Sequence, residues 1–276
     1  MGSTIAIGLN GERCVIPAPQ YGYETKITLP FHWQRRIPTG YSANDDGTAY
    51  DVRMCEAEWM LNEVDVALFT QFYTRVGRGA DVNLWLHKNS GFTPFGPDRG
   101  DYGNYQVTIS DVSIRGPQSA PYKYFTLACT LTAHTFPTVT APTTQYDGLF
   151  QIGSAVGLRF PDDFPQAEQS YAIEQIFTRD GTAYARDRLP GSDNYETVLK
   201  MVCSRSRAYA LLTYLVSTVR TNNLTIETLA GTYMFGSENG SGGTYVCQWV
   251  DSEILVKHSG FNRYEFELRF SLVSRE

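Results

Sequence analysis

The sequence contains no hydrophobic run long enough to cross a membrane. A transmembrane helix needs about 20 consecutive apolar residues, and no stretch of this 276-residue chain approaches that length. The first residues also lack a basic region followed by an apolar block, so we expect no signal peptide. Both absences argue against a membrane as a partner of the protein.

Cysteine is sparse and poorly spaced for cross-linking. An odd number of cysteines at wide spacing makes a poor disulfide framework. The chain also has no Cys-x-x-Cys pair or Cys/His grouping that would suggest a zinc or iron–sulfur site. We therefore expect free thiols, buried or half-buried, in a protein made in a reducing compartment. The residues concerned are Cys14, Cys55, Cys129, Cys203 and Cys247.

Charge is also low, and its balance is acidic. Lys and Arg number 23 against 29 Asp and Glu, which gives a net charge of −6 and argues against a basic nucleic-acid-binding surface. Charged residues are 19% of the chain and aromatic residues 13%, with 24 glycines, which is typical of a folded, β-rich protein. The length suits one large domain or two of about 130 residues each.

Motifs of catalysis are missing too. The chain has no Gly-x-Ser-x-Gly elbow, no P-loop and no Gly-x-Gly-x-x-Gly fingerprint after a strand. Asp162 and Asp163 lie in what reads as a solvated turn, and nothing places a second acid opposite them as a glycosidase requires. We therefore predict no enzyme and assign no catalytic, cofactor-binding or metal-binding residue and no cofactor. The four histidines are scattered: His32, His87, His134 and His258.

Three other patterns resemble recognition motifs. Arg99-Gly100-Asp101 is an adhesion-type tripeptide, but it lies in a Gly/Pro/Asp-rich loop where such triplets arise freely. Asn223-Leu224-Thr225 and Asn239-Gly240-Ser241 fit glycosylation sequons, which we interpret as accidental. Tyrosines could line a carbohydrate groove, although strand tyrosines more often pack across strands. These are Tyr102, Tyr105, Tyr122, Tyr124, Tyr245 and Tyr264.

The most informative feature is similarity between the two halves of the chain. A DGTAY segment occurs at residues 46–50 and again at 180–184, an offset of 134 residues. Three further matches follow in the same order, at offsets of 143, 140 and 141 residues. They pair 67–76 with 210–219; Phe95-Gly96, Tyr105, Asp111 and Ile114 with Phe235-Gly236, Tyr245, Asp251 and Ile254; and Phe125, Leu127, Cys129 and Leu131 with Phe266, Leu268, Phe270 and Leu272.

These matches predict a duplicated domain. We place the first domain, with an N-terminal arm, at residues 1–134 and the second at 149–276. Residues 135–148 between them are rich in Thr and Pro, which favours an extended, semi-rigid linker.

Each half is expected to contain one helix and several strands. Apolar residues at helical spacing predict helices over about residues 63–76 and 205–219. Extended segments at 25–29 and 155–160 come first, and alternating strands at 82–86 and 224–229 follow the helices. A long hairpin ends each half, at Thr132 and Val273. The fold class is therefore mainly β with one helix per domain (α+β).

Each half resembles the small tube-like domain of bacteriophage tail proteins, and above all the distal tail or minor tail proteins of long flexible-tailed phages. The similarity covers about residues 20–134 and, by the duplication, 149–274. Residues 197–201 depart from it by replacing the tryptophan-containing strand. The pattern rests on Asp46-Gly47, Trp59-Met60-Leu61, a helix with Leu68, Phe69 and Phe72 that runs into Gly77 and Gly79, Leu84-Trp85-Leu86, Pro94, and strands at 105–110 and 125–133.

The resemblance implies two tandem tail-tube-like β-sandwich or barrel domains and a structural role in the virion, after assembly in the cytoplasm of a host bacterium. Such domains pair edge to edge in a ring of six that encloses a lumen. Three chains would make a pseudo-sixfold ring, and six chains using one domain each would make a hexamer. The long hairpins and the loops at 89–104 and 233–243 would contact neighbouring rings.

Implied partners are other copies of the chain, the tail tube protein, the tail hub or central fibre protein and the tape measure protein. DNA would pass through the lumen without specific binding. Two alternatives stay open: a tail tube protein with a duplicated domain, and a tandem β-sandwich that binds carbohydrate.

Overall fold

The computed structural model consists mainly of antiparallel strands with two helices, which confirms the predicted mainly-β fold with one helix in each half. Fifteen strands are linked by pairing into one sheet system, and two further hairpins stand apart from it. The structure describes residues 4–19, 22–29, 31–36, 40–45, 52–87, 90–116, 124–136, 150–152, 156–158, 166–170, 173–177, 183–187, 194–219, 223–228, 234–235, 242–251, 253–260 and 262–275. The predicted linker at 135–148 begins one residue too early, because Thr135 ends β9; its residues 137–148 and the Asp162-Asp163 turn lie outside the described residues.

Residues 4–136, here called the N-terminal repeat, begin with a hairpin that belongs to the sheet and is not a separate arm. Its strand β1 pairs with β7 and buries Ile5, Ala6 and Ile7. The elements of this repeat are β1 (Thr4–Leu9), β2 (Glu12–Pro17), β3 (Glu24–Thr28), β4 (Phe31–Arg36), β5 (Gly40–Asp45), β6 (Val52–Asn62), α1 (Glu63–Phe72), η1 (Tyr73–Gly77), β7 (Asp81–Leu86), η2 (Pro97–Arg99), β8 (Gly103–Arg115) and β9 (Tyr124–Thr135).

Residues 150–275, here called the C-terminal repeat, follow the same order of elements. They are β10 (Phe150–Ile152), β11 (Val156–Leu158), β12 (Gln166–Ser170), β13 (Ile173–Phe177), β14 (Ala183–Asp187), β15 (Asn194–Cys203), α2 (Arg205–Thr213), η3 (Tyr214–Val219), β16 (Leu224–Thr228), β17 (Gly243–Trp249), β18 (Glu253–Gly260) and β19 (Arg263–Arg275).

The strand order repeats as well. The N-terminal repeat reads β2-β1-β7-β8-β9-β6-β3, and the C-terminal repeat reads β11-β10-β16-β17-β19-β15-β12. Both β17 and β18 pair with β19, so together they take the place that the single long strand β8 holds beside β9. Strand β8 is itself irregular at this point, where its register against β9 shifts and Asp111 adopts a positive φ of 51°.

Two of the sequence equivalences are wrong in detail. Residues 156–158 form the edge strand β11, as β2 forms the edge of the other repeat, and β12 is the counterpart of β3. The last strands match with a shift of two residues, because Leu131 opposite Ile109 corresponds to Phe270 opposite Trp249. The DGTAY match falls on residues 46–50 and 180–182, which lie outside the described residues.

A side-chain cap marks the start of α1, and a π-helical turn marks the end of each helix. Asn62 caps α1 by accepting a hydrogen bond from the Asp65 amide (2.9 Å), and two acidic residues lie in the first turn, where the helix dipole favours them. Both helices then widen into a π-helical turn, and Gly79 (φ 71°) follows the first. Neither helix among the described residues is long and apolar enough to cross a membrane.

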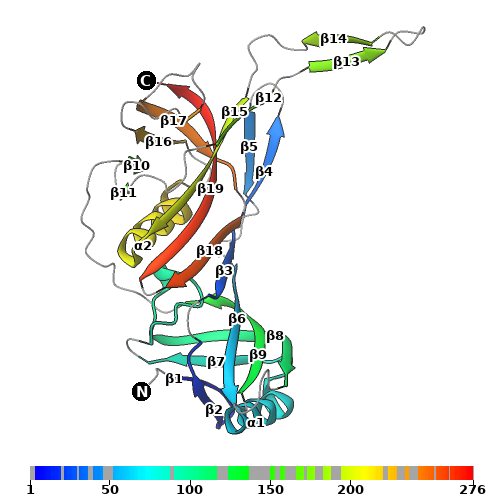
Figure 1. Ribbon diagram of the computed structural model, residues 1–276, viewed down its shortest axis with the longest axis vertical. Coiled ribbons are helices and arrows are strands. Elements are labelled where there is room, and N and C mark those ends of the chain that lie inside the picture. Colours follow the sequence, from blue (N-terminus) through cyan, green and yellow to red (C-terminus); the bar gives the residue numbers. More distant parts are fainter. Residues whose placement is uncertain are drawn as a thin grey trace.

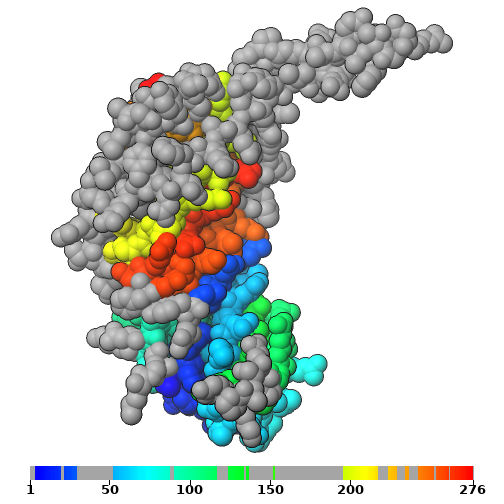
Figure 2. All heavy atoms as spheres, viewed as in Figure 1, coloured from blue at the N-terminus to red at the C-terminus, as the bar shows by residue number. Residues whose placement is uncertain are grey.

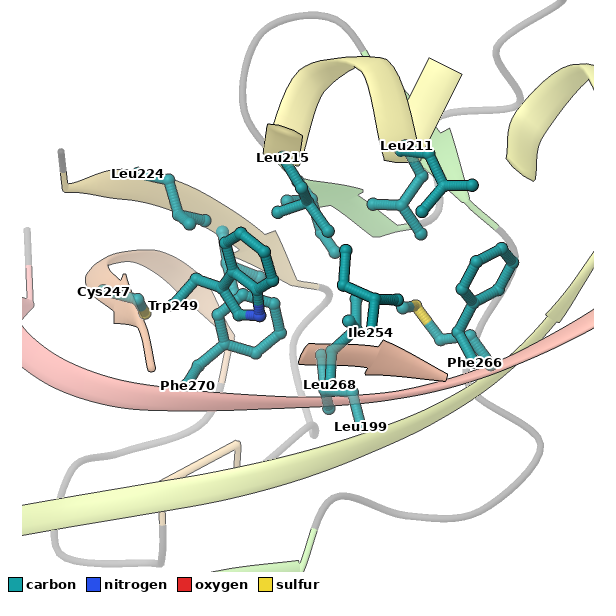
Figure 3. Packing of buried hydrophobic residues seen from close by; sticks show 14 of the residues in the cluster. Leu199, Leu211, Leu215, Leu224, Cys247, Trp249, Ile254, Phe266, Leu268 and Phe270 are labelled. Carbon is teal, nitrogen blue, oxygen red and sulfur yellow. The ribbon is translucent and has the colours of Figure 1, made fainter. Parts of the chain in front are cut away.

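Each repeat has its own hydrophobic core between its helix and one face of its sheet. In the C-terminal repeat, Leu211 of α2 and Leu215 of η3 lie over Ile254, Trp249 and Phe270 of the sheet (Figure 3). The two repeats follow each other along the long axis of the molecule, and the β13–β14 hairpin projects from the far end (Figure 1).

Candidate functional site

The two repeats are joined by a strand that both of them share. Strand β3 pairs with β6 of its own repeat on one edge and with β18 of the C-terminal repeat on the other, both antiparallel. Its side chains Ile27 and Leu29 lie in the core of the C-terminal repeat. In Figure 2 the blue atoms of β3 lie directly against the orange atoms of β18. The junction is therefore a continuous sheet, in which the backbone of one repeat completes the other.

A buried ion pair anchors the loop before β8. The Arg53 guanidinium, fully buried on β6, donates two hydrogen bonds to the Asp98 carboxylate (2.6 and 2.7 Å) and one to the Phe95 carbonyl (2.6 Å). Gly96 has a φ of 96°, and a Cβ there would stand 2.9 Å from the Asp98 carboxylate. A glycine is required at this point by the backbone conformation and by the close approach of the ion pair.

The same loop then docks on the C-terminal repeat. Arg205, the first residue of α2, forms a two-pronged ion pair with Asp101 (2.8 and 3.0 Å). The short helix η2 packs along α2, and the Leu212 side chain approaches Gly96. The sequence predicts that this loop contacts neighbouring rings. Instead, its described residues from Phe92 to Asp101 are largely buried inside the chain, because charged side chains on both repeats hold it there.

Aromatic side chains complete the junction. The Thr93 hydroxyl lies 3.0 Å from the Tyr23 hydroxyl and 3.1 Å from the Tyr264 hydroxyl, which links both repeats through one threonine. The His258 ring stacks on Tyr264 and meets Tyr23 edge-on, with centroids 4.8 Å apart in each case. Burial lowers the pKa of His258 to about 4, so this histidine is neutral at physiological pH.

Away from the cores, the sheet carries an open polar face. Beginning at β12, eight strands pair in the order β12-β15-β19-β18-β3-β6-β9-β8, all antiparallel. One face of this eight-stranded arc packs under the helices. The other presents charged residues at alternate positions: Glu24, Lys26, Glu56, Glu58, Lys200, Glu253, Lys257, Arg263, Glu265, Glu267 and Arg269.

Three hollows indent the polar face. Glu24, Glu56, Glu58 and Asp111 line the first. The others are lined by side chains of both signs, including Lys200, Arg263 and Glu265 in one and Lys26, Glu253 and Arg269 in the other. Lys26 and Glu253 form an ion pair (2.8 Å) directly across the junction between the repeats. Opposite charges thus alternate along this face, and no basic stripe forms among its described residues.

Most of the other sequence motifs contribute to packing and form no binding site among the described residues. Arg99-Gly100-Asp101 lies at the inter-repeat junction, and Asp101 is buried against Arg205, so this tripeptide is no exposed adhesion motif. Tyr105, Tyr245 and Tyr264 are buried, whereas Tyr102 and Tyr124 are exposed, so the described tyrosines line no common groove. All five cysteines are free and buried, as predicted. His87 is exposed, and Tyr122 and Asn239-Gly240-Ser241 lie outside the described residues.

Sequence reasoning missed the residues of the junction, although one signal was present. Arg53 stands in register with the buried residues Cys55, Ala57 and Trp59 of an alternating strand, where a charge must find a partner. Asp98, which follows a Gly-Pro turn, is that partner. Compared with protein-family models and with curated protein sequences, the chain matches none.

Proposed function

We propose that the protein is a structural component of a phage tail tip. It would be a ring-forming distal tail or minor tail protein that links the tail tube to the central hub or fibre and lines the DNA channel. The observation that carries this proposal is the continuous pairing of β18 with β3, because it joins two topologically equivalent repeats edge to edge. A second edge-to-edge contact of the same kind between chains would extend the arc.

Three chains would supply twenty-four strands to such a ring. With strands about 4.8 Å apart and tilted by about 40°, a closed barrel of that size measures roughly 45–50 Å across its backbone. That bore is wide enough for a DNA double helix. The helices would lie outside, and the polar face of the arc would line the lumen.

The charge pattern of the polar face suits passage better than binding. DNA-binding surfaces gather Lys and Arg to replace counterions on the phosphates. Here the cations Lys26 and Lys200 each stand beside a carboxylate, that of Glu253 at 2.8 Å and that of Glu267 at 3.9 Å. A lumen of this composition would offer the DNA phosphates few unpaired cations to bind.

Native mass spectrometry of the full chain, followed by negative-stain imaging, tests the proposal. A closed ring of three chains with a central hole is the expected result, and a ring of six would assign one repeat of each chain to the lumen. Open-ended tubes would identify a tail tube protein instead. A compact oligomer without a hole would exclude the role as a channel.

A further inference from the structure

The chain presents, at its two ends, unpaired counterparts of the two strands that meet at its centre. Strand β3 finds its counterpart in β12, and β18 finds its counterpart in the last residues of β8. Among the described strands, β12 pairs only with β15, and residues 110–115 of β8 pair only with β9. Each copy therefore offers, within the part of the chain that the structure describes, one free edge of each kind.

Two aliphatic side chains show what the free edge lacks. Ile114 lies opposite Leu127 of β9, and its counterpart Val256 lies opposite Phe266 of β19. Val256 is only 2% exposed, because β3 pairs alongside it, whereas Ile114 is 40% exposed. The same place in the repeat is thus covered in one repeat and open in the other.

The helices of the two repeats differ in the same sense. Helix α2 buries Ala208, Leu211 and Leu212, and η2 of the N-terminal repeat packs along it. Helix α1 buries only two residues, and its Val64 and Leu68 are 67% and 45% exposed. An unpaired strand edge and exposed apolar side chains are each typical of an association surface.

We propose that strand β12 of a second copy pairs with residues 112–115 of β8, so that copies join head to tail as the two repeats join within one chain. This inference rests on the proposed function and names its interface and its partner, a second copy of this chain. One free edge of each kind per copy gives a heterologous contact, which propagates until a ring closes.

The contact inside the chain also sets the register between chains. Thr25 lies opposite Cys55 on one side and Val256 on the other. Thr197 is the counterpart of Cys55 and lies opposite Ala167, and Ile114 is the counterpart of Val256. Ala167 of one copy is therefore expected opposite Ile114 of the next, and Gln166 opposite Arg115.

Engineered cysteines test this register in the full chain. The double variant Arg115→Cys/Gln166→Cys should form covalent dimers and larger species under mild oxidation, and reduction should remove them, because Cα atoms of paired strands lie within disulfide reach. A second rung, Ser113→Cys/Glu168→Cys, repeats the test if the first variant folds poorly. The native cysteines are buried and contribute little background.

The matched control moves one cysteine to the opposite edge of the same sheet. Val15→Cys/Gln166→Cys keeps the same cysteine in β12 and places the second thiol on β2, where Val15 is 42% exposed. It should remain a single chain, as should each single variant. Dimers from Arg115→Cys alone would mean that β8 pairs with itself and would overturn the proposal.

Imaging of the same samples separates this inference from the proposed function. Closed rings without cross-links in either double variant would overturn the strand assignment and leave the ring standing. Cross-linked open chains that never close would support the strand assignment and overturn the ring. Single chains in both measurements, at concentrations where the wild type assembles, would overturn the head-to-tail contact.

Discussion

Ile27 of β3 lies opposite Ile254 of β18, and neither side chain is exposed to solvent. The two residues stand at opposite ends of the chain, yet they share one core. The strand that carries Ile27 also hydrogen-bonds to β6, so neither repeat is complete without the other.

Shortening two isoleucines, one buried at the junction and one at the free edge, should therefore have unequal effects on stability. Ile254→Ala is expected to lower the free energy of unfolding by roughly 2–5 kcal/mol, because it opens a cavity in a packed core. Ile114→Ala should cost less than about 1 kcal/mol in the isolated chain, since its side chain is already partly in water. Urea unfolding of both variants at low concentration measures the difference, and equal losses would contradict it.

A charge at the free edge should weaken self-association without unfolding the chain. Ile114→Glu places a carboxylate where the next copy is expected to pack, and the dissociation constant should rise at least about tenfold. Val15→Glu, at a similarly exposed apolar position on β2, serves as the control and should associate like the wild type. Sedimentation over a range of concentrations distinguishes the two variants.

The buried ion pair gives a third prediction. Asp98→Ala leaves the Arg53 guanidinium without its carboxylate, which should cost about 3–5 kcal/mol. The double variant Arg53→Met/Asp98→Leu removes both charges and should recover much of that loss. The exposed pair Arg75–Glu12 is the comparison, and its removal should cost at most about 1 kcal/mol. No recovery in the double variant would show that the pair has another role.

The buried His258 and the half-buried Asp251 should give opposing pH dependences. Burial lowers the pKa of His258 to about 4, so the unfolded chain binds more protons than the folded chain between pH 4 and about 6.5. Stability from this group falls as the pH drops through that window. Burial raises the pKa of Asp251 to about 6, so this carboxyl stabilises the fold as the pH drops from about 6 towards 4.

Single variants separate the two contributions. Between pH 7.5 and 4.5, His258→Gln should retain roughly 2–3 kcal/mol that the wild type loses, and Asp251→Asn should lose roughly 2 kcal/mol more than the wild type. Urea midpoints at the two pH values give the comparison. A His258→Gln profile parallel to that of the wild type would mean that this histidine titrates normally.

Thiol reactivity supplies a fifth prediction. Burial raises the pKa of Cys14 to about 11, with Asp65 adding to the effect, and burial raises the pKa of Cys129 and of Cys203 to about 12. Few thiolates then exist at neutral pH, and the sulfur atoms are covered. A disulfide exchange reagent should modify no cysteine of the folded chain within minutes and all five in denaturant. Fast modification of the folded chain would point to local opening.

Local patterns predicted much of each repeat. Apolar residues at helical spacing gave helices close to 63–76 and 205–219, and the structure continues both helices through a π-helical turn to Gly77 and Val219. The alternation in β19 marked its buried and wet faces correctly. Such patterns are readable because each residue's burial depends on its neighbours in the same element.

The junction could not be read in the same way. Nothing in the five residues of β3 indicates that its second partner is β18, because backbone hydrogen bonds form in the same way between near and distant parts of a sequence. The loop before β8 was misassigned for a related reason. Its Gly, Pro and Asp residues are typical of a solvated turn, and only the buried Arg53 and the distant Arg205 convert those aspartates into anchors.

The shared strand also determines when the chain can finish folding during translation. Strand β3 leaves the ribosome early, but its partner β18 follows more than 220 residues later. At about 5–20 residues per second, that interval lasts on the order of 10–50 seconds. During this time the outer edge of β3 is open, and it can be closed within the chain only after residues 253–260 are made. A nascent chain therefore lacks the complete junction between its repeats until that point. Assembly with a neighbouring copy consequently begins only when translation is nearly complete.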